Sequence, residues 1–283
     1  MAVVTGGRRH TVATVARYVV LAVASALFLL PFYLLFRNAF MRQSDITAPE
    51  WHWLPPEWAW DNVTLLFTDP AVPMARALLN SVLVSVTQTA GVLVLSALAG
   101  YGLARIPYRW NNVVAGLITA TLLIPAAVTF VPSFVLVSSL GWVSTLRGLI
   151  IPGLFQALAT FLFRQFFSSF PREIEEAAFI DGLGWWGTFW RIVMPNSLGF
   201  TAAIGTITFI GTWNAFLWPL VIAQDQNAWT VQIALSTFLT AQSINLPELF
   251  MAGLIAILPL LVMFLFLQRW IVEGVERTGL GGN

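Results

Sequence analysis

The sequence predicts an all-α protein that crosses a membrane with six helices. Of its 283 residues, 58% are hydrophobic and only 10% are charged, whereas soluble domains contain about 25% charged residues. The apolar residues also form blocks of about 18–25 residues, the length that a helix needs to span a bilayer. Together these observations favour a polytopic helical membrane protein, and the whole chain, residues 1–283, is expected to form a single transmembrane domain.

Six apolar blocks are the expected transmembrane helices. None of them contains Asp, Glu, Lys, Arg or His, the residues that mark proton relays and ion-coupled carriers inside a membrane. Five prolines in the blocks are expected to kink their helices; they are Pro125, Pro132, Pro152, Pro219 and Pro259. The blocks are Tyr18–Phe36, Leu79–Leu103, Val113–Val137, Gly148–Phe163, Gly199–Ala223 and Phe250–Leu267.

The distribution of arginine predicts that the N- and C-termini are both cytoplasmic. The chain has no Lys, and arginine is enriched in the cytoplasmic loops of membrane proteins. Residues 37–78 are then an extracytoplasmic loop and residues 164–198 a cytoplasmic one. In this orientation ten arginines are inside, Arg8, Arg9, Arg17, Arg105, Arg109, Arg164, Arg172, Arg191, Arg269 and Arg277, and four are outside, Arg37, Arg42, Arg76 and Arg147.

The extracytoplasmic loop is rich in tryptophan and proline. Trp51, Trp53, Trp58 and Trp60 lie close together in it. Tryptophan favours the headgroup region, where its ring is half apolar and its N–H reaches water. We expect this loop to lie on the outer membrane surface, with Asp61–Phe67 as a short interfacial helix.

The composition argues against several kinds of catalytic site. There is no Cys, and the two histidines, His10 and His52, lie outside the apolar blocks. A standard ATP-binding P-loop needs a Lys that reaches the phosphates, and the chain has none. We therefore expect neither an enzyme nor a metal or cofactor site, and any ATP that drives the protein is expected to bind a partner.

Uncharged polar residues follow one face of two blocks. Small polar residues at helical spacing are typical of close helix packing in lipid, and they are also suited to the wall of a wet, uncharged path. Primary amides are stronger candidates for such a path, because an unpaired amide in hydrocarbon is costly; pairing with a neighbouring helix is the alternative for them. The candidate path residues are Gln88, Gln156, Trp213 and Asn214, and they suit a neutral hydroxylated solute.

The cytoplasmic loop contains the pattern of a short docking helix. Pro171 suits a helix start and Gly182 a helix end. Glutamates in the first turns favour the positive end of the helix dipole, and Ala177 and Ala178 allow close contact with another protein. A second short helix is expected over Trp185–Val193, ending before Pro195. The alternative is an ordinary solvated loop.

This loop resembles the cytoplasmic signature of the permeases of binding-protein-dependent ABC importers. That signature has Glu-Ala-Ala, three residues, Gly, nine residues, Ile, one residue and Leu-Pro. The chain keeps every spacing, with Met194 in place of Leu as the one departure. The matching residues are Glu176, Ala177, Ala178, Gly182, Ile192 and Pro195.

The resemblance extends to the carbohydrate-importer branch, in particular to the smaller six-helix permease of the maltose type. It covers most of the chain, from about Asp61 to Gly274. Leu183-Gly184 and the absence of a Lys-Gly ending depart from the family pattern. The further residues that support it are Asn80, Ser81, Tyr101, Arg105, Ile180, Asp181, Trp213, Asn214, Gln268, Arg269 and Gly274.

The resemblance implies the type I ABC importer permease fold in a bacterial inner membrane. It implies import of a sugar, oligosaccharide, polyol or glycerol-phosphate type of solute. It also implies a second related permease, two ATP-binding subunits and an extracytoplasmic solute-binding protein as partners. A stand-alone secondary carrier or facilitator is the alternative. The residues expected to contact the ATPase are Glu176, Ala177, Ala178, Asp181, Gly182, Ile192 and Pro195.

Overall fold

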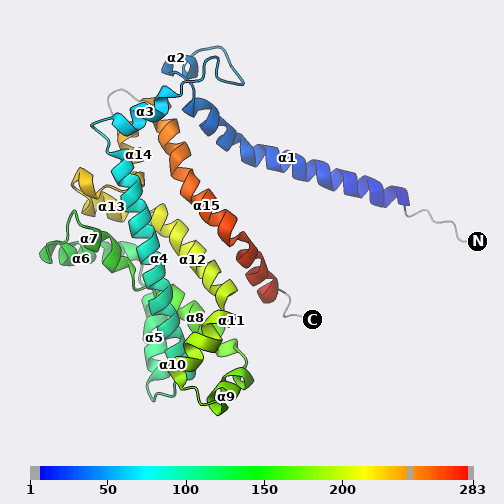
Figure 1. The fold of residues 1–283 in the computed structure, drawn as a ribbon, viewed down its shortest axis with the longest axis vertical. Helices are drawn as coiled ribbons and strands as arrows, with labels where there is room; N and C mark the ends of the chain where they lie inside the picture. Colours follow the sequence, from blue (N-terminus) through cyan, green and yellow to red (C-terminus); the bar gives the residue numbers. More distant parts are fainter. Residues whose placement is uncertain (1–6, 241–244, 280–283) are drawn as a thin grey trace, which may run out of the picture. The chain divides into compact units, whose positions relative to one another are not determined.

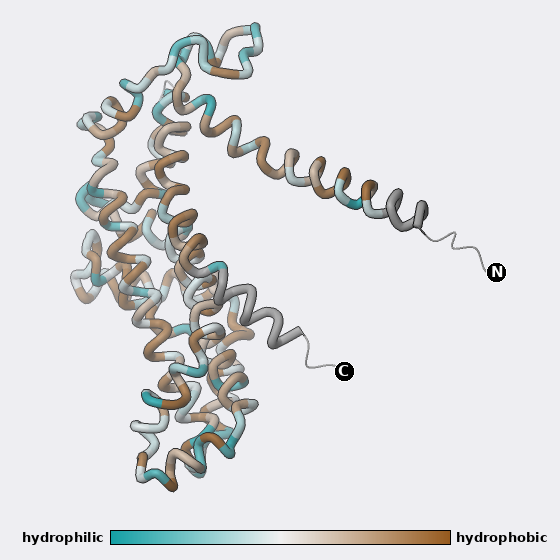
Figure 2. Tube along the Cα trace, turned by 45° about the vertical axis from the view of Figure 1, so that its right-hand side comes forward, coloured by the Kyte–Doolittle hydropathy of each residue, from teal (hydrophilic) through white to brown (hydrophobic). Residues whose placement is uncertain are grey.

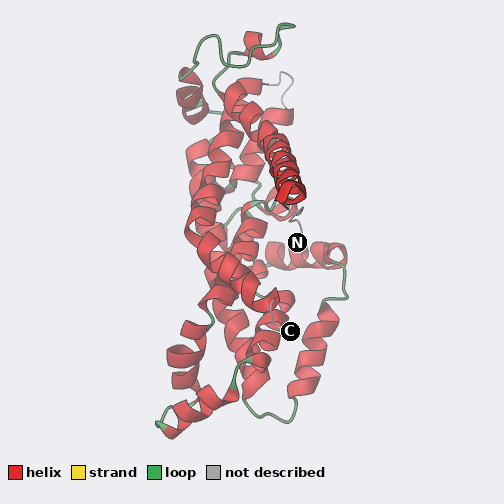
Figure 3. Ribbon diagram, turned by 90° about the vertical axis from the view of Figure 1, so that its right-hand side faces the viewer, coloured by secondary structure: helices red, strands yellow, loops and turns green. Residues whose placement is uncertain are grey.

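The structure is built from helices and loops. The computed structural model of the chain describes residues 7–240 and 245–279, and these ranges contain no strand (Figure 3). The predicted all-α class is therefore confirmed. Short 3₁₀ helices are labelled η1 and η3, and a π-helix is labelled η2. In chain order the elements are α1 (Gly7–Ala39), α2 (Gln43–Ile46), α3 (Asp61–Thr68), α4 (Met74–Arg105), α5 (Asn111–Thr121), α6 (Ala126–Ser139), α7 (Leu146–Ile150), η1 (Ile151–Gly153), α8 (Ala157–Ser169), α9 (Arg172–Ile180), α10 (Trp185–Thr188), η2 (Phe189–Val193), α11 (Met194–Asn196), α12 (Leu198–Trp213), α13 (Leu217–Ile222), η3 (Gln226–Ala228), α14 (Val231–Thr240) and α15 (Leu246–Gly279).

Three helices are long and apolar enough to cross a membrane alone. They are Thr14–Ala39 within α1, the whole of α4, and Leu246–Phe266 within α15. Three bent helix pairs have the same length and apolar character, so the count rises to six if each pair forms one span. Hydrophobic residues predominate along the long helices in Figure 2. This arrangement agrees with the predicted polytopic membrane protein.

Two of the three bends lie in apolar blocks that contain proline. Block Val113–Val137 is two helices, α5 and α6, whose axes differ by 97°. Pro125 immediately precedes α6, and proline disfavours the helical conformation of the residue before it. Pro152 lies in η1, between α7 and α8, where the bend is 41°. The expected kink at Pro125 is confirmed, although its size changes one expected helix into two.

The contacts between residues group the chain into two units, which we describe separately. Unit 1 comprises Met1–Asp69 and Thr237–Ile255, and unit 2 comprises Pro70–Ser236 and Ala256–Asn283. The helices α14 and α15 each contribute residues to both units.

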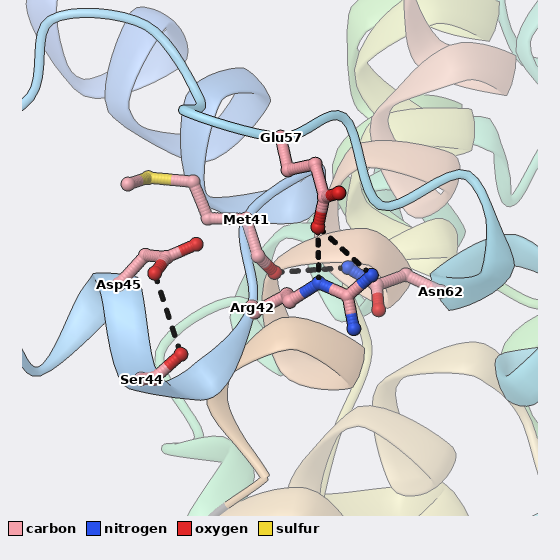
Figure 4. Close-up of polar contacts among 6 residues, drawn as sticks. All are labelled: Met41, Arg42, Ser44, Asp45, Glu57 and Asn62. Atoms are coloured by element: carbon pink, nitrogen blue, oxygen red, sulfur yellow. Dashed lines mark hydrogen bonds and ion pairs between the residues drawn. The ribbon is translucent and has the colours of Figure 1, made fainter.

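In unit 1, polar contacts hold the segment that follows α1. The side-chain amide of Asn62 donates to the carbonyl oxygens of Ala39, at 2.9 Å, and Met41, at 3.0 Å. Arg42 and Glu57 form an ion pair at 3.1 Å (Figure 4). Asn62 is buried and belongs to α3, so the helix expected at Asp61–Phe67 is confirmed and is fixed to the end of α1.

The tryptophans of unit 1 form an aromatic cluster with one arginine. The guanidinium of Arg37 lies 4.0 Å from the ring centroid of Trp51, a cation–π contact. Trp51 and Trp53 pack edge to face and are more than half exposed. Exposed indoles at this end of a membrane helix suit the headgroup region, and the location of this loop on the outer surface stays a prediction.

Helix α4 is the centre of unit 2. It packs along α8 and α12 (Figure 1), and the three helices meet in an aromatic core. Gly100 is where α4 and α8 come closest, because a Cβ there would lie 2.6 Å from Phe163 Cβ and 2.8 Å from the backbone nitrogen of Arg164. The buried core residues are Val92, Ala97, Tyr101, Ala159, Phe163, Phe167, Phe189, Val193 and Ile204.

We predict that Gly100→Ala destabilises the protein, because neither a Cβ atom nor a backbone nitrogen of α8 can move aside without moving the helix. Overpacking of this kind costs about 1–3 kcal/mol. Thermal unfolding in detergent measures the effect. Gly102→Ala is the matched control, since a Cβ at Gly102 has no neighbour within 4 Å. Equal melting temperatures for the two variants would contradict the close approach of α4 and α8.

Candidate functional site

Unit 2 contains a cavity of about 430 Å³ with both apolar and uncharged polar side chains in its lining. Residues from α4, α6, α12 and α13 line it, together with the α7–η1 segment. Among the described residues that line it, none is charged. Trp218 is held at its wall by a 3.0 Å hydrogen bond from the indole nitrogen to the Gly148 carbonyl oxygen. The principal polar residues of the lining are Ser81, Ser85, Gln88, Gln156, Thr208 and Thr212.

Two side-chain amides converge on one carbonyl in this cavity. The Nε2 atoms of Gln88 and Gln156 lie 3.3 and 3.5 Å from the carbonyl oxygen of Gly153. A Cβ at Gly153 would lie 2.6 Å from Cδ of Gln88, so glycine makes room for that amide. The hydroxyls of Ser85 and Thr230, also in the lining, are buried without a hydrogen-bond partner among the described residues.

Of the four residues predicted for the path, the structure brings Gln88 and Gln156 together and places the other two elsewhere. Trp213 is buried, and its indole nitrogen donates to the Ala256 carbonyl oxygen at 3.1 Å. Asn214 is exposed and accepts a hydrogen bond from Gln232 at 3.3 Å. Both lie outside the lining of this cavity. A role of any of the four in a solute path stays a prediction.

The first turns of α4 are bound to the segment before α14. The Asn80 amide donates to the carbonyl oxygens of Asn227, at 2.8 Å, and Trp229, at 2.9 Å. The Ser81 hydroxyl accepts from the backbone N–H of Val231 at 2.8 Å. The Asn80-Ser81 pair thus holds the start of α4 beside the cavity, a role that its sequence context did not indicate.

The helices α9, α10, η2 and α11 form one continuous platform, residues 172–196, at one end of unit 2 (Figure 1). Gly182 ends α9 with φ +85°. The N–H of Gly182 donates to Phe179 O and the N–H of Leu183 to Ala178 O, each at 3.0 Å. These two bonds are the Schellman motif of a glycine-terminated helix. The predicted helix end at Gly182 is confirmed.

The predicted end of the second platform helix is wrong. Helical residues continue past Val193 to Asn196, through Pro195. A π-helix, η2, precedes Pro195. Proline has no N–H for the bond to the fourth preceding residue and its ring collides with that carbonyl. A widened turn removes that collision, so the helix passes the proline without ending.

The seven residues predicted to contact an ATPase lie on the platform, and most of them are accessible. Glu176, Gly182 and Pro195 are exposed on its surface. The other four, Ala177, Ala178, Asp181 and Ile192, line a groove of about 440 Å³ together with Glu173, Ile174 and Leu183. The structure therefore assembles four of the seven into one concave surface and leaves three beside it.

Glu175, which the sequence did not single out, is the buried carboxylate of the platform. Its Oε2 lies 2.9 Å from Nε of Arg105, with the two side chains 5% and 4% exposed. The Arg105 guanidinium also donates to the carbonyl oxygen of Phe170. Burial raises the pKa of Glu175, and the charge of Arg105 opposes that rise. The sequence has glutamate at 173, 175 and 176, and it does not indicate which of the three is buried.

A bundle of membrane-spanning helices around an uncharged cavity, with a helical platform at one end, defines a membrane component of a transport system. Residues 92–277 match the family described as "Binding-protein-dependent transport system inner membrane component", and the chain belongs to this family. It is thus a multi-pass inner-membrane permease of a binding-protein-dependent ABC importer, and the predicted family is confirmed.

Two relatives match most of the chain. The "sn-glycerol-3-phosphate transport system permease protein UgpE" of Yersinia pestis bv. Antiqua (strain Antiqua) is 31% identical over 264 residues, which are 91% of this chain and 94% of that one. The "Arabinooligosaccharides transport system permease protein AraQ" of Bacillus subtilis (strain 168) is 30% identical over 228 residues, 81% of each chain.

A solved structure has the same fold. It is described as "Crystal structure of a bacterial ABC transporter involved in the import of the acidic polysaccharide alginate". The TM-score is 0.83 at 19% sequence identity, with 94% of this chain and 98% of that chain covered. At this identity the likeness shows the fold, which is the permease fold implied by the sequence resemblance.

We predict that Gly182→Ala loosens the platform, because a Cβ at positive φ costs about 1–2 kcal/mol. The amide hydrogens of α9 are expected to exchange about 5–30 times faster in the variant. Hydrogen exchange with mass spectrometry measures this. Gly184→Ala is the control, since Gly184 has φ −84° and a Cβ there has no neighbour within 4 Å. Unchanged exchange in Gly182→Ala would show that the turn does not hold α9.

Proposed function

We propose that this permease passes a neutral, hydroxylated, sugar-like solute through the cavity of unit 2. The observation that supports this most is the lining, where hydroxyls and amides alternate with aromatic and aliphatic side chains and no described residue is charged. Small-molecule sites have volumes of about 300–1,000 Å³, and this cavity of about 430 Å³ lies within that range. The unpartnered hydroxyls of Ser85 and Thr230 and the amides of Gln88 and Gln156 suit the hydroxyl groups of a sugar.

A glycerol-phosphate type of solute is the second candidate. The first turn of α6, with Ala126 and Thr129, lines the cavity, and a helix N-terminus favours an anion by about 0.3–1 kcal/mol. The printed name of one relative also specifies sn-glycerol 3-phosphate. A phosphate carries close to two negative charges, and removing them from water costs several kcal/mol per ion in a protein. The helix dipole offsets only a fraction of that cost, so the neutral solute is favoured.

The platform is the proposed contact with the ATP-binding subunits. Its groove combines apolar Ile174, Ala177 and Ile192 with the carboxylates of Glu173 and Asp181, which suits an apolar segment with cationic or N–H-rich surroundings. Glu176 is exposed beside the groove, and a charge-assisted hydrogen bond to it contributes about 1.5–3 kcal/mol when water is excluded.

The remaining partners and the orientation belong to the same proposal. The chain pairs with a second related permease above two ATP-binding subunits, and an extracytoplasmic binding protein delivers the solute. Both termini face the cytoplasm. Residues 1–6 and 280–283, and the side chains of Arg8, Arg9, Arg269 and Arg277, lie outside the described part of the structure.

The experiment is uptake into proteoliposomes that contain the chain, its second permease and the ATPase subunits, with the binding protein added. We expect uptake of a neutral oligosaccharide that requires both ATP and the binding protein. Competition by excess glycerol 3-phosphate is expected to be weak. Uptake without ATP, by the chain alone, would instead identify a stand-alone carrier.

Replacing both cavity amides tests the path itself. Gln88→Leu with Gln156→Leu removes two donors that pair with solute hydroxyls, and lost hydrogen bonds of about 0.5–1.5 kcal/mol each are expected to raise the KM for uptake about 5- to 150-fold in total. Gln165→Leu, on the exposed face of α8, is the control. A KM equal to wild type in the double variant would contradict solute binding in this cavity.

A further inference from the structure

We infer that Arg105 and Glu175 form a joint that makes α9 and α4 move together, so that displacement of the platform reaches the cavity along α4. The inference rests on the proposed function, because it assumes that an ATPase displaces the platform. Both residues act as positioning residues, since neither lines the cavity nor faces the platform groove.

The ion pair between Arg105 and Glu175 is buried, unlike most ion pairs on protein surfaces. The side chains of Arg105 and Glu175 are 4% and 5% exposed, with a nitrogen–oxygen distance of 2.9 Å. A buried charge that loses its partner is strongly destabilising, unlike an exposed ion pair, which contributes little. Separation of α9 from the end of α4 would break an ion pair that the surrounding packing shields from water. The two helices therefore stay together when one of them moves.

Aromatic contacts of Tyr101 also hold the platform against the end of α4. The Tyr101 ring lies 5.0 Å from Phe189 of η2 and 5.7 Å from Phe167 of α8, centroid to centroid. Phe189 and Val193 are buried in the core that surrounds α4. Tyr101 thus contacts the second half of the platform, Phe189 of η2, through its ring. Arg105 adds a bond to the Phe170 carbonyl oxygen, immediately before α9.

Helix α4 connects this joint to the cavity. It has 32 residues without an internal proline, and the residues on its earlier turns, Ser81, Ser85 and Gln88, line the cavity. At 1.5 Å per residue, the distance along the helix from Gln88 to Arg105 is roughly 25 Å. An unbroken helix of this length transmits a tilt at one end to the other. No element other than α4 is needed to carry a displacement of α9 to the cavity.

A purely structural ion pair would predict a different phenotype. If Arg105 and Glu175 only stabilised the fold, their loss would lower uptake and ATP hydrolysis together, in proportion to the amount of assembled complex. A joint predicts that hydrolysis continues while import falls. The ratio of ATP hydrolysed to solute imported in assembled complex therefore separates the two roles.

The test uses Glu175→Gln and Arg105→Gln, which keep side-chain size and remove one charge each, in the reconstituted complex. We expect assembly by pull-down and an ATP-to-solute ratio about 2- to 30-fold above wild type. The charge-reversed double variant, Arg105→Glu with Glu175→Arg, is expected to lower the ratio again. Arg109→Gln is the control, because Arg109 is exposed just beyond α4 and should keep the wild-type ratio.

If the variants do not assemble with their partners, the joint is tested on the full chain alone in nanodiscs. The measurement is the distance between a spin label at the end of α4 and one at the end of α9. The chain has no Cys, so spin labels attach only at the introduced residues of Ile106→Cys and Ile180→Cys. Both positions are accessible to the label, with exposed fractions of 39% and 87%. A narrow distance distribution that broadens in Glu175→Gln supports the joint. An equally narrow distribution, or a wild-type ATP-to-solute ratio in both single variants, overturns it. If the wild-type complex itself shows no ATP-dependent uptake, the proposed function fails instead.

Discussion

The close packing of α4 against α8 holds the functional features of unit 2 together. It depends on Gly100, where any side chain would collide with the Phe163 Cβ atom and the backbone of Arg164. The aromatic core that fills the surrounding space contains Tyr101, Phe163 and Phe167 as well as Phe189 and Val193 of the platform. The platform therefore shares one hydrophobic core with α4, the helix that lines the cavity.

This arrangement explains how a membrane region without ionisable side chains in its predicted spans obtains energy. Nothing in the six apolar blocks can bind or release a proton near neutral pH, which agrees with the proposal that the driving force comes from ATP-binding partners. The platform offers an accessible groove and the exposed carboxylate of Glu176 to a partner. The buried ion pair between Glu175 and Arg105 connects that surface to α4.

Much of this organisation was predictable because it depends on local chemistry. Apolar block length predicts membrane helices, and the helix that ends at Gly182 follows from a glycine after an amphipathic run. Its φ of +85° is the conformation that only glycine adopts without strain. Pro125 predicted a kink for the same local reason.

The remainder depends on tertiary contacts that a single sequence does not specify. Glu173, Glu175 and Glu176 all suit the first turns of a helix, and only the approach of Arg105 decides which one is buried. The 97° bend between α5 and α6 depends on what packs against each half. Trp213 was predicted to line a solute path, and the structure buries it with its indole nitrogen bonded to the Ala256 carbonyl oxygen, outside the cavity lining; its role in a path stays a prediction. Pro195 was expected to end a helix, and a π-turn allowed the helix to continue.

The most direct measurement of the central claim is the reactivity of a cysteine in the cavity during the ATP cycle. Ser133→Cys is a small change at a partly exposed position of the cavity lining, in a chain that has no other Cys. In the reconstituted complex we expect its labelling rate with a water-soluble maleimide to differ between the ATP-bound and ATP-free states. The difference is expected to vanish when Glu175→Gln is added. A state-dependent labelling rate that persists in the Glu175→Gln background would contradict transmission through the Arg105–Glu175 pair.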